Sequence, residues 1–448
     1  MKGAIRLPPS SDLFFVGIVM AIAAKVTMKI SPCTDMPFLP LWEKIFMGHA
    51  SLLCEGDSCT VSPLENGAAG PIALAYEEIP YKDFVVFCLL GCKKSLSIDP
   101  LPRKRLDIWT AFAAECGCTL NVSEQFGVKV LSLCNEDRFR IRDSVKNADQ
   151  MHALLGLGMG LSQQIAVTTD SAFSSALRTI VPSFGFDLNV SSNLRDKNDD
   201  PIARRMRFMQ MGKKTNTPIL YNVTADFTKK NNTPCEITVP GDDVLCAVVL
   251  AAKCVVPRGS LIVENAGLES WNSQTLALVK KMGGVVAMQE TGITSFGSVG
   301  TISVQKMGLA GRKVECLPLY SYSQQLPAMV IIAAFAQGQS VFRGIEDLRN
   351  DEPDGIDKIV SFVKAAGMRF GEMPDGIVID GGRQYDGFDI AERLSAPLAA
   401  AATVAALHCM GVSTINEESI VRRWPRFAEL VLSLCELKGG ASSAAEQA

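Results

Sequence analysis

The sequence lacks several features that would identify common classes of protein. Its 448 residues carry a formal net charge of −3, so it has no basic excess of the kind that binds nucleic acid. It has only three histidines, and its 14 cysteines do not recur at the spacing of a metal site. The apolar run Leu13–Ala24 is only 12 residues long, too short to span a bilayer. We therefore expect no metal, no cofactor, no nucleic-acid partner and no membrane partner.

The cysteine content favours a reducing compartment. Free cysteines without a pattern are typical of cytoplasmic proteins, in which they behave as small core residues. Lys2 and Arg6 before the apolar run Leu13–Ala24 also resemble a secretory signal. The same run is the first of a series of repeated helices, and we favour that interpretation and a cytoplasmic location.

One structural unit is repeated six times. Six apolar, alanine-rich runs recur, each typical of a buried helix. They are Leu13–Ala24, Phe84–Gly91, His152–Gly160, Val244–Cys254, Ala328–Gln337 and Leu398–Gly411. A second helix follows in each copy and ends at a glycine, which suits the left-handed conformation of a helix end. These glycines are Gly48, Gly117, Gly185, Gly283, Gly367 and Gly439.

The unit is predicted as helix–strand–helix–strand–turn–strand over about 70 residues. Buried helices inside and sheets outside predict an α/β fold of the inside-out barrel type, with three copies in each of two domains. We place the first domain at residues 8–240 and the second at 241–448, with strand 1–7 added to it. The last copy lacks its final strands, and strand 1–7 is expected to complete it. We expect a monomer.

Four segments carry a family resemblance. They are Val239–Asp242, Leu278–Gly283, Leu326–Gly338 and Trp424–Phe427. Together they resemble the EPSP synthase (3-phosphoshikimate 1-carboxyvinyltransferase) family, an enolpyruvyl-transferase family, over nearly the whole chain and best in the second half. The resemblance implies a two-domain inside-out α/β barrel whose domains close over the substrates. It also implies a shikimate-pathway transfer that joins shikimate-3-phosphate to phosphoenolpyruvate and releases phosphate.

The resemblance maps eight residues onto the family's active site. Two fall at catalytic positions, namely Glu352 and Gln324, the latter where the family has an aspartate. Six fall at substrate-binding positions: Ser10, Lys82, Arg105, Gln150, Arg393 and Arg422. Several other family positions have lost their chemistry. Ser11 and Val16 stand where the family has Lys and Arg, Phe173 replaces a tyrosine, Asp351 replaces a lysine and Gly355 an arginine.

These losses weaken the expected electrostatics. Two polyanionic substrates need several fixed cations, and each charge-assisted hydrogen bond contributes roughly 1.5–3 kcal/mol. Losing four of eight cations and adding Asp351 is expected to cost about 6 kcal/mol or more, on the order of 10⁴-fold in affinity. A glutamine at position 324 does not accept a proton, so the sequence predicts that shikimate-3-phosphate is not converted at a useful rate.

Three functions remain open. In the first, the chain is a degenerate homologue, a pseudoenzyme. It binds either a small anion, such as phosphoenolpyruvate or a shikimate-like acid, or a partner protein. Alternatively it is an enolpyruvyl transferase that acts on a less charged substrate, or an EPSP synthase whose cations come from other positions. Arg105 is either an anion ligand or a charge that flanks a helix. His152 is expected in the core, and the run Gly156–Gly160 is better explained by close helix packing than by dinucleotide binding.

Overall fold

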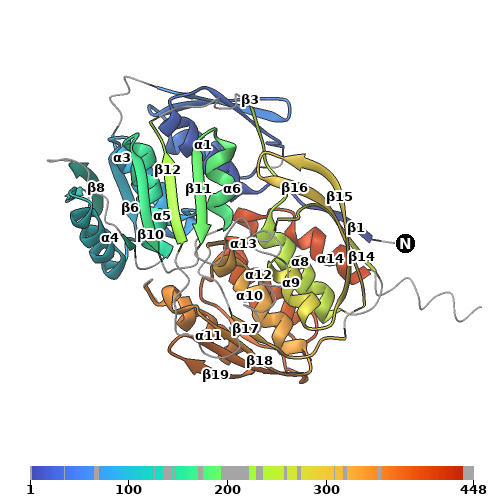
Figure 1. Ribbon diagram of the computed structural model, residues 1–448. Coiled ribbons are helices and arrows are strands. Elements are labelled where there is room, and N and C mark those ends of the chain that lie inside the picture. The colour runs from blue at the N-terminus through green and yellow to red at the C-terminus, as the bar shows by residue number, and fades with distance from the viewer. Residues whose placement is uncertain are drawn as a thin grey trace, which may run out of the picture.

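The computed structural model describes residues 3–436, except 35, 65–69, 126, 135–143, 146–147, 170–174, 193–220, 229–235, 257–259, 270–273, 307, 316–319 and 351–354. Two hydrophobic cores divide the described elements into two lobes (Figure 1). Within the described ranges, no helix has both the length and the apolarity that crossing a membrane requires.

The six apolar runs form six helices, as predicted. They are α1 (Ser11–Ala24), α3 (Lys82–Gly91) and α5 (Ala148–Gly160) in the first lobe, and α8 (Asp243–Val255), α10 (Tyr320–Phe335) and α12 (Ala396–Ala406) in the second. Every residue of α1 except Asp12 is buried. Polar caps set two of the helix starts: the side chain of Ser10 accepts from the backbone N–H of Leu13, and that of Asp242 caps α8.

Close packing of α3 against α5 depends on glycine, as predicted for the run Gly156–Gly160. A Cβ at Gly156 would lie 2.1 Å from the carbonyl oxygen of Phe84, and one at Gly160 would lie 2.4 Å from that of Cys88. Only hydrogen fits at these positions. In the second lobe, α8, α10 and α12 contact one another as a group of three buried helices.

The first lobe contains three four-stranded sheets. Their strand orders are β13 (Glu236–Thr238)–β2 (Met28–Ser31)–β4 (Ser58–Pro63)–β3 (Ala50–Glu55), then β5 (Ile72–Ala75)–β6 (Leu96–Asp99)–β8 (Val128–Cys134)–β7 (Thr119–Gln125), and β11 (Asp187–Ser192)–β12 (Tyr221–Asp226)–β10 (Gln164–Thr169)–β9 (Ser144–Val145).

The second lobe has two four-stranded sheets and a two-stranded one. Their orders are β1 (Gly3–Arg6)–β14 (Leu261–Gly267)–β16 (Gly297–Lys306)–β15 (Val285–Thr294), then β17 (Lys313–Glu315)–β18 (Gly338–Arg343)–β20 (Gly376–Gly381)–β19 (Arg369–Met373), and β21 (Asp389–Ile390)–β22 (Thr414–Ile415). In each of the six sheets one edge strand pairs in parallel, and the remaining pairs are antiparallel.

Further helices follow the first strands of the copies. They are α2 (Leu39–Ile45), α4 (Arg103–Glu115), α6 (Ser175–Ser183), α9 (Gln274–Lys281), α11 (Gly355–Ala365), α13 (Glu418–Arg423) and α14 (Phe427–Glu436), with 3₁₀ turns η1 (Tyr76–Glu78) and η2 (Glu346–Asn350). Five of the six predicted glycine stops adopt a positive φ: Gly48, Gly117, Gly185, Gly283 and Gly367. This confirms the prediction for those five, because the left-handed region favours glycine. Gly439 lies outside the described residues.

Two segments cross between the lobes side by side. β1 precedes α1 in the chain, yet it pairs with β14 of the second lobe, whereas β13 precedes α8 and pairs with β2 of the first lobe. At the crossing, the N–H of Ser10 donates to the carbonyl of Pro240 at 2.9 Å, and the N–H of Asp242 donates to that of Pro8 at 2.8 Å. Figure 1 shows the N-terminal strand beside the strands that follow α8.

The predicted role of the N-terminal strand is wrong in one respect. The strand joins the second lobe, but it completes the sheet of the fourth copy by pairing with β14, not the sheet of the last copy. The edge beside β14 is open to it because β13, the strand immediately before α8, pairs with β2 in the other lobe. The described part of the last copy has only the pair β21–β22.

Candidate functional site

Ion pairs connect the two lobes where they face each other. Arg422, at the end of α13, forms an ion pair with Glu78 of η1 at 3.1 Å. Lys358 of α11 binds the neighbouring Glu77 at 2.9 Å. Lys104 of α4 donates to the backbone carbonyl of Arg349. These contacts place the predicted position Arg422 at the junction of the lobes.

Arg105 is buried between two carboxylates. Its Nη1 lies 2.8 Å from Oδ2 of Asp149 and 3.4 Å from Oδ1 of Asp83, and the residue is only 5% exposed. The indole N–H of Trp109 donates to Asp83 at 2.6 Å. In these contacts one cation faces two carboxylates, which reduces the positive charge that Arg105 offers to an anionic ligand. The sequence predicted the arginine but not these partners.

Three further predicted binding residues lie in the first lobe. Lys82 begins α3, and its ammonium group lies 4.9 Å from the ring centroid of Tyr76, a cation–π contact. Gln150 follows Asp149 in the first turn of α5. Ser10 is 1% exposed, and its hydroxyl caps α1.

Arg393 and Arg422 both act on Glu78. Burial raises the pKa of Glu78, and this outweighs the opposing effect of the two arginines, of which Arg422 is the stronger. Arg393 also lies 3.4 Å from Glu418, with about half of its side chain exposed. Each arginine therefore has a carboxylate partner within the protein.

The two predicted catalytic positions have different outcomes. Gln324 lies in α10 and is half-buried, and its carboxamide does not ionise near neutral pH. Glu352 lies outside the described residues. His152, predicted as a core residue, is 5% exposed, and burial lowers its pKa to about 4.

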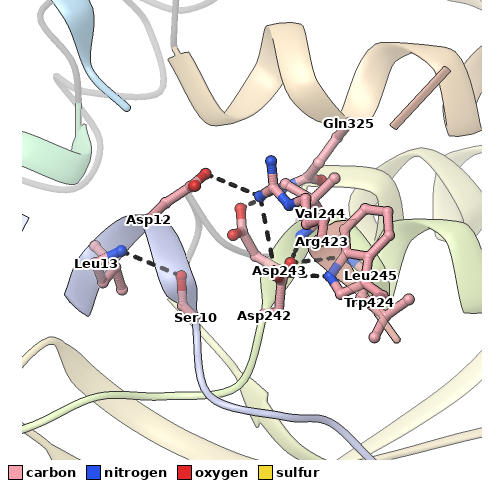
Figure 2. Close-up of polar contacts among 10 residues, drawn as sticks. All are labelled: Ser10, Asp12, Leu13, Asp242, Asp243, Val244, Leu245, Gln325, Arg423 and Trp424. Carbon is pink, nitrogen blue, oxygen red and sulfur yellow. Dashed lines mark hydrogen bonds and ion pairs between the residues drawn. The ribbon is translucent and has the colours of Figure 1, made fainter. Parts of the chain in front are cut away.

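A buried carboxylate cluster at the crossing was missed by the sequence reasoning (Figure 2). The guanidinium of Arg423 lies 3.1 Å from Asp12 of α1 and 3.9 Å from Asp242 at the start of α8. The indole N–H of Trp424 donates to Asp242 at 3.1 Å. A signal was present in the adjacent acidic pair Asp242–Asp243, which opens an apolar helix. The contacts themselves join segments more than 180 residues apart and have no local signature.

Protonation of this cluster follows from its burial. Burial raises the pKa of Asp243 to about 8, and the nearby charges of Asp242 and Asp12 act in the same direction. The amide N–H of Gln325 donates to Asp243 at 2.9 Å, and the oxygen of the same amide accepts from the hydroxyl of Thr275. Burial also raises the pKa of Asp242, although the charge of Arg423 opposes the shift. The cluster can therefore hold a proton at neutral pH.

A cavity of about 1020 Å³ lies against the cluster. Its walls include the crossing segment Arg6–Pro9, the loop at Cys33, and residues of α14. Arg423 and Asp242 also line it, whereas none of the sequence-predicted site residues appears among its described lining. The described residues contain no group of His, Cys, Asp and Glu side chains arranged to hold a metal ion.

Comparison with known proteins identifies the family to which the sequence is similar. The sequence model described as EPSP synthase (3-phosphoshikimate 1-carboxyvinyltransferase) matches residues 209–431. The 3-phosphoshikimate 1-carboxyvinyltransferases of Zymomonas mobilis and Carboxydothermus hydrogenoformans are 31% and 28% identical to the chain over 208 and 202 residues. The chain belongs to the EPSP synthase family.

The match to each of these relatives covers 45% of this chain and 46% or 47% of the relative, so the chain spans about half the length of the curated relatives it matches. Solved structures agree in fold over more of the chain. EPSP synthase from Acinetobacter baumannii has a TM-score of 0.65 at 16% identity, with 96% of this chain and 95% of that chain covered. The enolpyruvyl transferase NikO from Streptomyces tendae has a TM-score of 0.63 at 15% identity, with 98% and 95% covered.

These similarities establish a mixed α/β fold of the family. The sequence match begins at residue 209, so Ser10, Lys82, Arg105 and Gln150 lie outside it. Their assignment to substrate binding stays a prediction.

Proposed function

We propose that this family member does not convert shikimate-3-phosphate and phosphoenolpyruvate at a useful rate, and that it acts by binding a ligand or a partner protein. The observation that carries the proposal is the burial of Arg105 between Asp83 and Asp149. An arginine held by two carboxylates is already neutralised, and a substrate anion would have to displace one of them or add to a local excess of negative charge.

The other predicted cations support the same conclusion. Arg422 is paired with Glu78, and Arg393 lies beside Glu418. The cations that are absent from the sequence are expected to cost about 6 kcal/mol in anion binding. The ion pairs add to this cost, because the remaining positive groups must first be released from their carboxylate partners. Gln324 stands at the position of the family's catalytic aspartate and does not serve as an acid or base.

Two measurements with the full chain test the proposal. Phosphate release is followed with shikimate-3-phosphate and phosphoenolpyruvate together, with the Acinetobacter baumannii EPSP synthase as the positive control. Calorimetric titration with each substrate alone reports binding. We expect no release above background and no binding in the micromolar range. Tight binding of both substrates, with release at the rate of the control, would refute the proposal.

One substitution tests whether Glu78 keeps Arg422 from binding an anion. E78Q removes the carboxylate that holds Arg422, so we expect phosphoenolpyruvate to bind several-fold more tightly than to the parent protein. E77Q is the matched control, because Glu77 neighbours it and pairs with Lys358, which is not a predicted ligand. Equal affinities in E78Q and E77Q would show that Arg422 does not form part of an anion site.

A second candidate is an enolpyruvyl transferase that acts on a related, less charged substrate. It is favoured by the approach of Arg393 and Arg422 to one carboxylate, Glu78, since two arginines at a lobe junction suit one carboxylate ligand. A thermal-shift screen with singly charged carboxylic acids tests it. Stabilisation that R422Q abolishes would assign Arg422 to a carboxylate site, and phosphate release from phosphoenolpyruvate in the presence of the stabilising acid would favour this enzyme over the first proposal.

The finer architectural predictions are also proposals. The group of buried helices in each lobe, together with the sheets, supports an inside-out barrel of six repeats. The two cores meet near residue 240, which supports domains at 8–240 and at 241–448 with strand 1–7. Among the cysteines whose side chains the structure describes, no pair forms a disulfide, which supports the reducing cytoplasm as the working location. The monomeric state stays a prediction.

A further inference from the structure

Three cysteines gather at the tip of the hairpin formed by β3 and β4. Cys54 and Cys59 lie directly opposite each other in the antiparallel ladder, one residue from the closing pair Glu55–Ser58. Cys33 approaches from the loop after β2, and its Sγ lies 3.9 Å from the carbonyl oxygen of Gly56 in the turn. The thiol of Cys54 lies close enough to the thiols of Cys33 and Cys59 to contribute to the raised pKa of each.

The loop and the hairpin tip are fastened together independently of the thiols. The carboxylate of Asp57 accepts from the backbone N–H of Cys33 at 3.1 Å and from that of Thr34 at 2.9 Å. These bonds hold the three sulfur atoms in one place. The cluster does not meet the geometry of a metal site among the described residues.

Exposure differs sharply within the cluster. Cys54 is exposed, whereas Cys33 is 6% exposed and Cys59 is fully buried. Burial raises the pKa of Cys33 to about 11, and it raises the pKa of Cys59 further still. The two buried thiols stay protonated and sheltered, so Cys54 is the thiol that meets an oxidant from solution.

We propose that Cys54 and Cys59 form a redox-active pair, with Cys54 as the attacking thiol and Cys59 as the resolving thiol. Residues that face each other in an antiparallel ladder have Cα atoms roughly 4.5–5.5 Å apart, within the range that a disulfide spans. Cys33 lies beside the pair, but it belongs to the loop after β2 and is not paired with Cys54 in the β3–β4 ladder.

The oxidant is a low-molecular-weight disulfide such as glutathione disulfide. The thiolate of Cys54 attacks one of its sulfur atoms, which forms a mixed disulfide and releases one glutathione thiolate. The sulfur of Cys59 then attacks Sγ of Cys54, expels the second glutathione, and gives up its proton to that leaving thiolate. Two protein thiols are oxidised, and one glutathione disulfide is reduced to two glutathione molecules.

The test uses the full chain incubated with glutathione disulfide, alkylated, and digested with a glutamate-specific protease. Cleavage after Glu55 separates Cys54 from Cys59, so a disulfide between them appears as one cross-linked peptide. We expect this cross-link in the parent protein, with the loss of the titratable thiols of both Cys54 and Cys59. In C59S we expect a lasting glutathione adduct on Cys54. In C54S we expect the loss at Cys59 to disappear.

Matched controls keep the assignment falsifiable. Cys134 is also exposed, but it lies opposite Thr119 in its ladder, so it should gain a glutathione adduct and no internal cross-link. C134S should leave the Cys54–Cys59 cross-link unchanged. A cross-link between Cys54 and Cys33 would overturn the role of Cys59. A stable adduct on Cys54 in the parent protein, or no reaction at all, would overturn the redox pair. Because peptide mapping of the parent protein is sufficient, a variant that fails to fold does not affect the outcome.

Discussion

At the scale of single residues, Asp243 gives the stability of the protein a defined pH dependence. Its pKa in the folded protein is about 8, above the ordinary value of 3.8, because it is buried near Asp242 and Asp12. Between these two values the folded state binds more protons than the unfolded state. The free energy of unfolding therefore decreases as the pH rises from about 4 to 8, through this group.

The variant D243N should remove this contribution. An asparagine keeps an oxygen that accepts from Gln325 but has no charge to bury. We expect the free energy of unfolding of D243N to exceed that of the parent protein by about 1–3 kcal/mol at pH 8, and by little or nothing at pH 4. Urea unfolding across this pH range measures it, with E290Q on the exposed face of β15 as the control. An unchanged slope in D243N would contradict the assignment.

Arg105 is predicted to matter for stability irrespective of any ligand. R105Q would leave the buried Asp83 and the half-buried Asp149 without their arginine, and breaking a buried ion pair from one side costs about 3–5 kcal/mol. D107N, on the exposed side of the same helix, should change the free energy of unfolding by less than about 0.5 kcal/mol. Chemical denaturation compares them. Equal stability in the two variants would indicate that Arg105 is only a ligand residue.

The residues that sequence reasoning found and missed differ in one physical respect. Arg105 and Arg422 could be located because each follows a local motif. Their partners Asp149 and Glu78 could not, because an ion pair between distant segments depends on the fold. The same holds for the contact of Arg423 with Asp12, which joins opposite ends of the chain.

At the scale of elements, the pattern of apolar helices and glycine stops was readable because both are local. A run that is apolar on all sides indicates a buried helix. A glycine at the end of the second helix of a copy indicates a residue in the left-handed conformation. The partner of strand β1 was not readable, since parallel pairing with β14 depends on where β13 goes. Strand order in such sheets is fixed by the crossing of two segments, not by the sequence of either one.

The contact of α3 with α5 predicts an unusual result for a glycine substitution. Alanine in place of glycine inside a helix normally stabilises by up to about 1 kcal/mol. G156A should instead destabilise by about 1–3 kcal/mol or more, because its Cβ would meet the backbone of Phe84. G17A is the control, since its Cβ meets only the flexible tip of the Ile30 side chain. Thermal unfolding that ranks G156A at or above the parent protein would disprove the close packing.

At the scale of the whole molecule, the lobe junction is held by the protein's own charges. The pairs Arg422–Glu78, Lys358–Glu77 and Arg423–Asp12 all join the first lobe to the second. In the family that the chain belongs to, such a junction is expected to receive anionic substrates. Here internal carboxylates already occupy the arginines, which connects the loss of cations in the sequence with the proposed loss of the reaction.

Phosphate release in the presence of both shikimate-3-phosphate and phosphoenolpyruvate tests this account most directly. With the Acinetobacter baumannii enzyme turning over in parallel, the account predicts release no faster than in buffer alone at every substrate concentration. Sustained release by this protein at an ordinary enzyme turnover, on the order of 1–10³ per second, would contradict it.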